Sequence, residues 1–173
     1  MTNLIPFRGR TPDTGAAAFT APTASLIGEV TLGTSASVFY GATVRADTAS
    51  IRIGSGTNLQ DNVVVHADPG YPARIGDRVS VGHGAVVHGC TIEDDCLIGM
   101  GATVLNGAVI GSCSLVAAGA VVLEGTVVPP RSLVAGVPAK VRRALDDAEV
   151  QAIRDNAERY TRLAEEHHQA LTS

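Results

Sequence analysis

The sequence is poor in aromatic and charged residues and contains no tryptophan. Aromatic residues make up 3% and charged residues 17% of its 173 residues, and the net charge is −4. No basic stretch has aromatic residues interleaved, so we expect no nucleic-acid partner. The apolar run LVAAGAVVL has only nine residues, far fewer than a membrane-spanning helix needs. We therefore expect no membrane span either.

The sequence also lacks a recognisable leader and any paired cysteine pattern. Its first residues, MTNLIPFRGR, contain no basic segment followed by a long apolar stretch, so we expect no signal peptide. Cys90, Cys96 and Cys113 are odd in number and lack Cys-x-x-Cys spacing. We expect reduced thiols packed as small hydrophobic side chains, and a cytoplasmic location.

The abundant residues are 21 valines, 9 isoleucines and 19 glycines, which favour strands and tight turns. From residue 98 the chain divides into hexads with an aliphatic first position and a small fifth position. Neither the helical period of 3.6 nor the strand period of 2 produces this pattern, which predicts a parallel β-helix. The first positions are Ile98, Val104, Ile110, Val116, Val122, Val128 and Val134, and the fifth are Ala102, Ala108, Ser114, Ala120, Thr126, Ser132 and Pro138.

Earlier hexads follow the same pattern with slips. An ordinary β-sandwich is the alternative, but it needs hairpin turns, and Asn106–Gly107 is the only Asn-Gly pair. We therefore predict an all-β domain over residues 1–145, with residues 1–20 irregular. The expected first positions of the earlier hexads are Ile27, Gly33, Phe39, Arg45, Ile53, Leu59, Val65, Ile75, Val81, Val87 and Ile92.

The last segment, residues 146–173, changes character and predicts an α-helix. Asp146 and Glu149 have the spacing of a capping box. An apolar stripe at helical spacing follows, which we expect to pack along the β-helix or across a subunit boundary. The stripe consists of Val150, Ile153, Ala157, Tyr160 and Ala164.

Three of the five histidines, His66, His83 and His88, fall within 23 residues. His66 and His88 each follow a first-position valine. If the extra residues of the loop ADPGYPA are left out of the hexad count, His66 and His88 occupy equivalent positions on successive coils. Neighbouring strands lie about 4.8 Å apart, so two outward imidazoles can share one metal ion. His83 lies elsewhere on its coil and requires a symmetric partner to join them. The alternative is three surface histidines on a polar face.

The segments RAD, NLQDNVVVHAD, VGHGAVVHGCTIEDDCLIGMGATVLNGAVIG and VAGVPAKVRR resemble the gamma-class carbonic anhydrase family, over nearly the whole chain from about Val30. The resemblance implies a left-handed β-helix of hexapeptide repeats, with three hexads in each triangular coil and about six coils over residues 27–139. It also implies a homotrimer. His66 and His88 of one subunit and His83 of its neighbour would hold Zn²⁺, with Fe²⁺ or Co²⁺ as alternatives.

The resemblance also assigns residues around the metal. Arg45 and Asp47 would pair across the subunit interface, although a plain structural salt bridge remains the alternative. Asn58 and Gln60 would lie near the metal, where an amide orients a bound oxygen. Asn58 also fits a turn residue, so Gln60 is the stronger catalytic candidate. The remaining matches are Asp61, expected close to Arg45, and Tyr160, expected in the pocket.

The implied activity is hydration of carbon dioxide to bicarbonate. The best-studied branch of the family carries proton-shuttle glutamates, whereas the loop here has Asp68 as its only carboxylate and Thr48 stands at a second glutamate position. We therefore expect weak activity. Two alternatives stay open. One is a CoA-thioester acyltransferase or thioesterase with a histidine base. The other is a catalytically silent, metal-stabilised trimeric scaffold.

Overall fold

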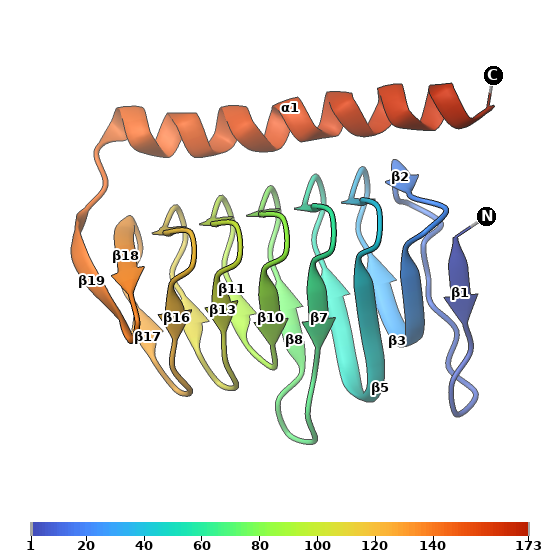
Figure 1. The fold of residues 1–173 in the computed structure, drawn as a ribbon, viewed down its shortest axis with the longest axis horizontal. Coiled ribbons are helices and arrows are strands. Elements are labelled where there is room, and N and C mark those ends of the chain that lie inside the picture. The colour runs from blue at the N-terminus through green and yellow to red at the C-terminus, as the bar shows by residue number, and fades with distance from the viewer. Residues whose placement is uncertain (1, 173) are drawn as a thin grey trace.

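The structure, a computed structural model, describes residues 2–172 as a left-handed parallel β-helix of about seven turns with one long helix along its side (Figure 1). Two sheets form its three faces. The first face is an eight-stranded sheet made of β2 (Phe19–Thr20), β4 (Ser37–Val38), β6 (Asn58–Leu59), β9 (Ser80–Val81), β12 (Leu97–Ile98), β15 (Leu115–Val116), β18 (Ser132–Gly136) and β19 (Ala139–Ala144).

The second sheet has eleven strands and wraps around the other two faces. It does so because β3 (Ser25–Leu32) and β5 (Thr43–Ile53) are long enough to run along both faces before the chain turns. The remaining strands are β1 (Asn3–Ile5), β7 (Val64–His66), β8 (Ala73–Ile75), β10 (Val86–His88), β11 (Thr91–Ile92), β13 (Thr103–Val104), β14 (Val109–Ile110), β16 (Val121–Val122) and β17 (Val127–Val128).

Aliphatic side chains in three columns fill the interior, one column behind each face. Every member is buried and lies in register with the residue one coil away, which confirms the hexad pattern from Ile53 to Val134. The columns are Leu26, Val44, Val65, Val87, Val104 and Val122; Leu32, Ile53, Ile75, Ile92, Ile110 and Val128; and Val38, Leu59, Val81, Ile98, Val116 and Val134.

The predicted register is wrong in the first four hexads, where the inward residue comes one position earlier. Leu26 fills the interior rather than Ile27, and Val44 does so rather than Arg45, whose side chain is exposed. The segment of residues 2–20 is not wholly irregular. It contains β1, which pairs with β3, and β2, which pairs with β4, so the coil begins earlier than predicted.

The coil ends at β18, after which β19 turns back antiparallel to it. Helix α1 (Asp147–Thr172) then runs along the eight-stranded face towards the first coils (Figure 1). The capping box is confirmed, because the N–H of Glu149 donates to the Asp146 carboxylate at 2.8 Å and the N–H of Asp146 donates to the Glu149 carboxylate at 3.1 Å. Val150, Ile153, Ala157 and Ala164 are buried beneath the helix.

Between residues 2 and 172, no helix is both long and apolar enough to cross a membrane. All three cysteines are free thiols. Burial raises the pKa of Cys90 and of Cys96 to about 12, so both remain protonated and pack as small hydrophobic side chains.

Candidate metal centre

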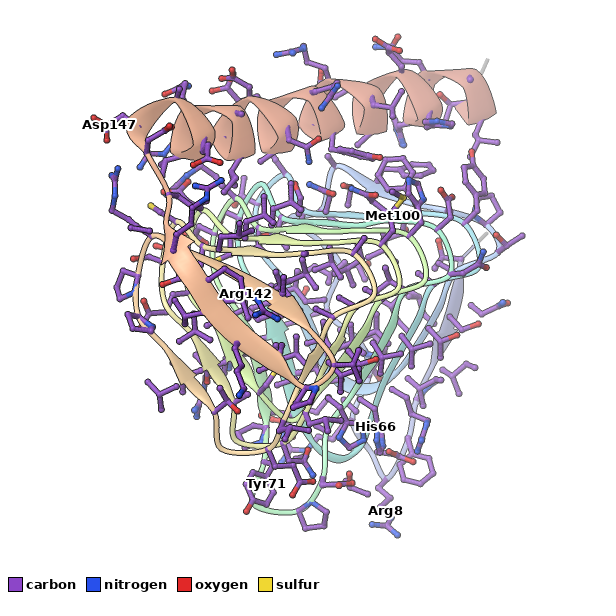
Figure 2. The ribbon with its side chains drawn as sticks, turned by 60° about the vertical axis from the view of Figure 1, so that its left-hand side comes forward. Arg8, His66, Tyr71, Met100, Arg142 and Asp147 are labelled. Atoms are coloured by element: carbon purple, nitrogen blue, oxygen red, sulfur yellow. The ribbon has the colours of Figure 1, made fainter. Side chains whose placement is uncertain are left out.

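His66 and His88 lie at the same corner of the coil, each as the last residue of its strand. They are register partners on the neighbouring parallel strands β7 and β10. Nδ1 of His66 lies 2.8 Å from Nε2 of His88, and the ring centroids are 4.8 Å apart. Figure 2 shows His66 at the corner of the coil opposite α1. The stacking predicted from the hexad count is therefore confirmed.

The outer nitrogen of His66 faces an ionised carboxylate. Nε2 of His66 lies 3.0 Å from Oδ1 of Asp47, whose other oxygen accepts a hydrogen bond from Arg45 at 2.5 Å. Burial raises the pKa of the Asp47 carboxyl, but hydrogen bonds from Arg45 and His66 outweigh burial and hold the pKa below its ordinary value. An ionised carboxylate only accepts hydrogen bonds, so the hydrogen of a neutral His66 ring sits on Nε2.

The outer nitrogen of His88 faces an amide oxygen. Nδ1 of His88 lies 2.7 Å from Oδ1 of Asn106. Nδ2 of the same amide donates to the carboxylate of Asp68 at 2.9 Å. The hydrogen of a neutral His88 ring therefore sits on Nδ1.

These contacts leave two hydrogen-free nitrogens facing each other. Nδ1 of His66 and Nε2 of His88 both present lone pairs across 2.8 Å, an arrangement that needs a proton or a cation between them. Metal-binding histidines typically donate their other N–H to a carboxylate or a carbonyl oxygen, as both rings do here. The carboxylate of Asp68 belongs to the same group, whose potential ligand atoms all lie within 4.8 Å of one another. The donor set suits zinc and similar divalent ions.

His83 lies at a different corner, in the turn after β9. Its ring is 44% exposed, Nδ1 lies 2.9 Å from Oδ2 of Asp61, and Nε2 lies 3.3 Å from the hydroxyl of Tyr160 on α1. Figure 2 places Met100, which lines the same groove as His83, close to α1 and away from His66. The sequence predicted that His83 cannot join His66 and His88 within one chain. The structure agrees, because His83 lies at a different corner from the other two histidines.

Tyr160 completes the surroundings of His83. Burial, and then the negative charge of Asp61, raise the pKa of the Tyr160 hydroxyl above its ordinary value. Tyr160 keeps its hydrogen at neutral pH and can donate it to Nε2 of His83, while Asp61 accepts from Nδ1. His83 thus carries its own hydrogen on Nδ1, with a carboxylate behind it as His66 has, and the lone pair of its Nε2 faces the Tyr160 hydroxyl.

A chain of hydrogen bonds connects α1 to Gln60 beside His83. Nδ2 of Asn156 on α1 and Nδ2 of Asn58 both lie 2.9 Å from Oγ of Ser80. Nε2 of Gln60 then donates to Oδ1 of Asn58 at 3.1 Å. Gln60, His83, Asn156 and Tyr160 line one groove, whose apolar wall contains Leu97, Ile98, Met100, Leu115, Val116 and Ala118.

Two sequence-based expectations remain predictions, because they concern contacts that a single chain does not contain. Arg45 and Asp47 form an ion pair within one chain, and their pairing across a subunit boundary stays a prediction. Within one chain Asp61 pairs with His83, and no ion pair of residues 2–172 joins it to Arg45, so its closeness to Arg45 also stays a prediction. Sequence reasoning also missed Asn106 and Asn156. Val87 pairs with Val104 on the next coil, so counting by register places Leu105 opposite His88 and Asn106 one residue further along.

Comparisons with known proteins agree on the fold and on the family. A family model described as "Bacterial transferase hexapeptide (six repeats)" matches residues 89–124, and "Hexapeptide repeat of succinyl-transferase" matches residues 72–104. The crystal structure of a hexapeptide transferase family protein from Anaplasma phagocytophilum superposes with a TM-score of 0.89 at 37% identity, covering 94% of this chain and 96% of that one.

Two curated relatives carry carbonic anhydrase names. "Probable carbonic anhydrase" of Methanocaldococcus jannaschii is 56% identical over 142 residues, covering 82% of this chain and 89% of that protein. "Gamma carbonic anhydrase 2, mitochondrial" of Arabidopsis thaliana is 44% identical over 155 residues, covering 86% of this chain. The chain spans 56% of the length of the Arabidopsis protein.

Proposed function

Since the chain belongs to the gamma-class carbonic anhydrase-like family of hexapeptide-repeat proteins, we propose that it hydrates carbon dioxide to bicarbonate at a metal site shared between subunits of a homotrimer. The observation that carries the proposal is the pair of facing, hydrogen-free nitrogens of His66 and His88. Zinc is the proposed ion, with iron or cobalt in the ferrous and cobaltous states as alternatives. Reduced cysteines favour a cytoplasmic location.

The residues divide into two half-sites on different corners of one chain. We define the first half-site as His66, His88 and Asp47, and the second as His83, Gln60 and Tyr160. A threefold assembly brings the first half-site of one subunit against the second half-site of the next. Each histidine has its outer nitrogen hydrogen-bonded, so that the nitrogen offered to the ion is fixed before the subunits meet.

Zinc, when bound, would lower the pKa of a water molecule to near 7, which would make hydroxide available at neutral pH. The residues of the chain then orient the reactants. Gln60, whose amide is held by Asn58, is placed to hydrogen-bond an oxygen of the substrate or of the developing bicarbonate. The apolar wall of the groove suits carbon dioxide, which has no charge.

We expect removal of the proton from the site to be the slow step of hydration. The Asp68 carboxylate already accepts from Asn106, and the Thr48 hydroxyl donates to the carbonyl oxygen of Ala67. Neither side chain replaces a mobile glutamate that carries protons to solvent. We therefore expect hydration to be limited by proton transfer to buffer.

The direct test is stopped-flow measurement of carbon dioxide hydration by zinc-loaded protein, together with its metal content and mass in solution. We expect one metal ion per subunit, a trimer, and hydration above the rate of buffer alone. His83→Ala should abolish hydration and weaken metal binding, because it removes the ligand contributed by the second half-site. A fully loaded wild-type trimer that hydrates no faster than buffer would contradict the proposal.

A second candidate is acyl transfer or hydrolysis of a CoA thioester. The groove favours it, because its apolar wall begins beside His83 and suits an acyl chain. The transferase name of the Anaplasma protein points the same way. A rise in melting temperature with CoA, and release of thiol from acetyl-CoA that is lost in His83→Ala, would support this candidate over hydration.

A further inference from the structure

We propose that Asn106 and Asp68 are positioning residues for the metal centre. Together they determine which nitrogen of His88 carries its hydrogen, and they hold that ring facing His66. The inference rests on the proposed function only in that a metal binds at His66 and His88. It makes no claim about turnover.

The orientation of the Asn106 amide decides the tautomer of His88. An amide has a donor end and an acceptor end, whereas the carboxylate of Asp68 only accepts. Because Nδ2 of Asn106 donates to Asp68 at 2.9 Å, Oδ1 must face Nδ1 of His88, which lies 2.7 Å away. A flipped amide would offer N–H groups to His88 and drive the ring hydrogen to Nε2. That nitrogen faces His66, so the flipped state is incompatible with metal binding.

The backbone at this corner leaves room for the amide. Gly89, next to His88, has a φ of +53°, which side chains rarely adopt. A Cβ atom at this position would lie 2.1 Å from Oδ1 of Asn106. The N–H of Gly89 donates to the carbonyl oxygen of His66, and its own carbonyl oxygen accepts from Gly107. The missing side chain of Gly89 therefore lets an amide from the next coil reach His88.

The carboxylate comes from the loop that interrupts the hexads, residues 67–73. The N–H of Tyr71 donates to the carbonyl oxygen of Asp68 at 2.8 Å, which closes the loop. The Tyr71 side chain lies against Gly89 and Gly107, and Figure 2 shows Tyr71 and His66 both on the side of the coil away from α1. The loop thus folds across two later coils and carries Asp68 to Asn106, which gives the interruption a role in the site.

A competing role for Asp68 is direct metal ligation, since its carboxylate lies within the same ligand group. Two observations favour positioning. The carboxylate already accepts from Asn106, and Asn106 connects it to the outer nitrogen of His88 rather than to the inner one. The two roles predict different effects of changes at Asn106, which does not belong to the ligand group.

The test compares zinc affinity of the full chain by competition with a chromophoric chelator, and the visible spectrum of the Co²⁺-loaded protein. Asp68→Asn frees the amide to flip, and Asn106→Leu removes the acceptor in nearly the same volume. We expect each to lower metal affinity on the order of 10–100-fold and to shift the Co²⁺ bands. Glu124→Gln is the matched control, because Glu124 is exposed at the corresponding position one coil further along.

The decisive variant exchanges the two groups, Asp68→Asn with Asn106→Asp. The new carboxylate at position 106 accepts from both His88 and the new amide at position 68. The hydrogen bond from His88 keeps its direction, and the bond between positions 68 and 106 is reversed but still made. We expect this double variant to recover most of the affinity and the wild-type Co²⁺ spectrum. Melting temperatures in chelator will show whether each metal-free variant is folded.

The outcomes separate the two proposals. Wild-type affinity in both single variants, or a double variant as weak as Asp68→Asn, would overturn the positioning role. Direct ligation by Asp68 would leave Asn106→Leu unaffected. Variants that lose metal as predicted, in a wild-type protein that binds zinc but hydrates no carbon dioxide, would overturn only the proposed activity. A wild-type chain that binds no metal would overturn both.

Discussion

His66 and His88 are register partners on adjacent parallel strands, and their facing ring nitrogens lie 2.8 Å apart. His83, at another corner of the same chain, turns instead towards Asp61 and Tyr160. The two half-sites therefore lie apart in one chain and would meet only between subunits. An active site shared between subunits can regain activity in mixed trimers of two inactive variants, whereas a site within one chain cannot.

Mixed trimers should regain activity that neither parent has. We expect His66→Ala and His83→Ala trimers each to be inactive. After they are unfolded together and refolded, about a quarter of the subunit contacts in random trimers join an intact first half-site to an intact second half-site. Hydration should return to roughly that fraction of wild type, measured by stopped flow. Refolding each parent alone is the control, and a mixture that stays inactive while forming trimers would contradict a shared site.

Hydration should depend strongly on buffer concentration. With Asp68 and Thr48 both engaged in hydrogen bonds, protons must leave to external buffer, so kcat should rise with imidazole concentration at fixed pH and ionic strength. Thr48→Glu adds a carboxylate at this edge and should reduce the dependence, while Thr48→Gln, of the same size without the charge, should not. A kcat that does not change with buffer would indicate a proton route within the protein.

Asn156 should influence turnover without affecting metal content. Its amide reaches Ser80, which also binds Asn58, and Asn58 holds the amide of Gln60. Asn156→Leu should lower kcat about tenfold and alter the pH profile, because Gln60 loses its fixed orientation. Glu158→Ala, an exposed change on the same helix, is the control. A normal kcat in Asn156→Leu would show that the helix does not position Gln60.

Asp95 joins the coil to α1 through ion pairs, and we expect acid to remove the stability that these ion pairs contribute. This buried carboxylate pairs with Arg78 at 2.7 Å and with Arg154 of α1 at 3.4 Å. The hydrogen bond from Arg78 lowers its pKa below the ordinary 3.8, although burial opposes this. A lowered folded-state pKa stabilises the fold above pH 3.8, and the contribution is lost as pH falls below that value. Asp95→Asn should therefore lower the melting temperature at pH 7 but much less at pH 3.

Glu158→Gln provides the reference for the acid experiment, because Glu158 is an exposed carboxylate on α1. Its melting temperature should follow that of wild type at both pH values. An Asp95→Asn protein that loses as much melting temperature on acidification as wild type would show that the Asp95 ion pairs do not contribute.

The hexad pattern predicted the coil well from Ile53 to Val134, where every predicted first position is buried in its column. Adjacent apolar pairs such as Leu97–Ile98 occur in many of these repeats, and the second residue of the pair faces inward. In the first hexads the count started from Ile27, the second residue of the pair Leu26–Ile27, but there the first residue of the pair fills the interior. Arg45 at a predicted inward position was the signal against the later register, because an unpaired charge is rarely buried.

The contacts of the site that join equivalent positions of the repeat could be predicted from the sequence, and the others could not. His66 and His88 stack because they are equivalent positions, so hexad counting found them. The pairing of Asp61 with His83 and the reach of Asn156 to Ser80 depend on how turns and α1 pack, which no spacing in the sequence specifies. Asn106 lies on the next coil, one residue beyond the position equivalent to His88, so the same counting does not single it out.

Helix α1 contacts β2, β4, β6 and β9 and reaches from the last coil back to the first (Figure 1). In repeat proteins each unit touches only its neighbours, so the ends can fray and melting can proceed piecewise. Because α1 contacts strands of several coils, one coil cannot unfold without disturbing its contacts with the helix. We therefore expect the chain to unfold in one cooperative transition. A chain from which α1 is deleted should instead unfold first at its terminal coils.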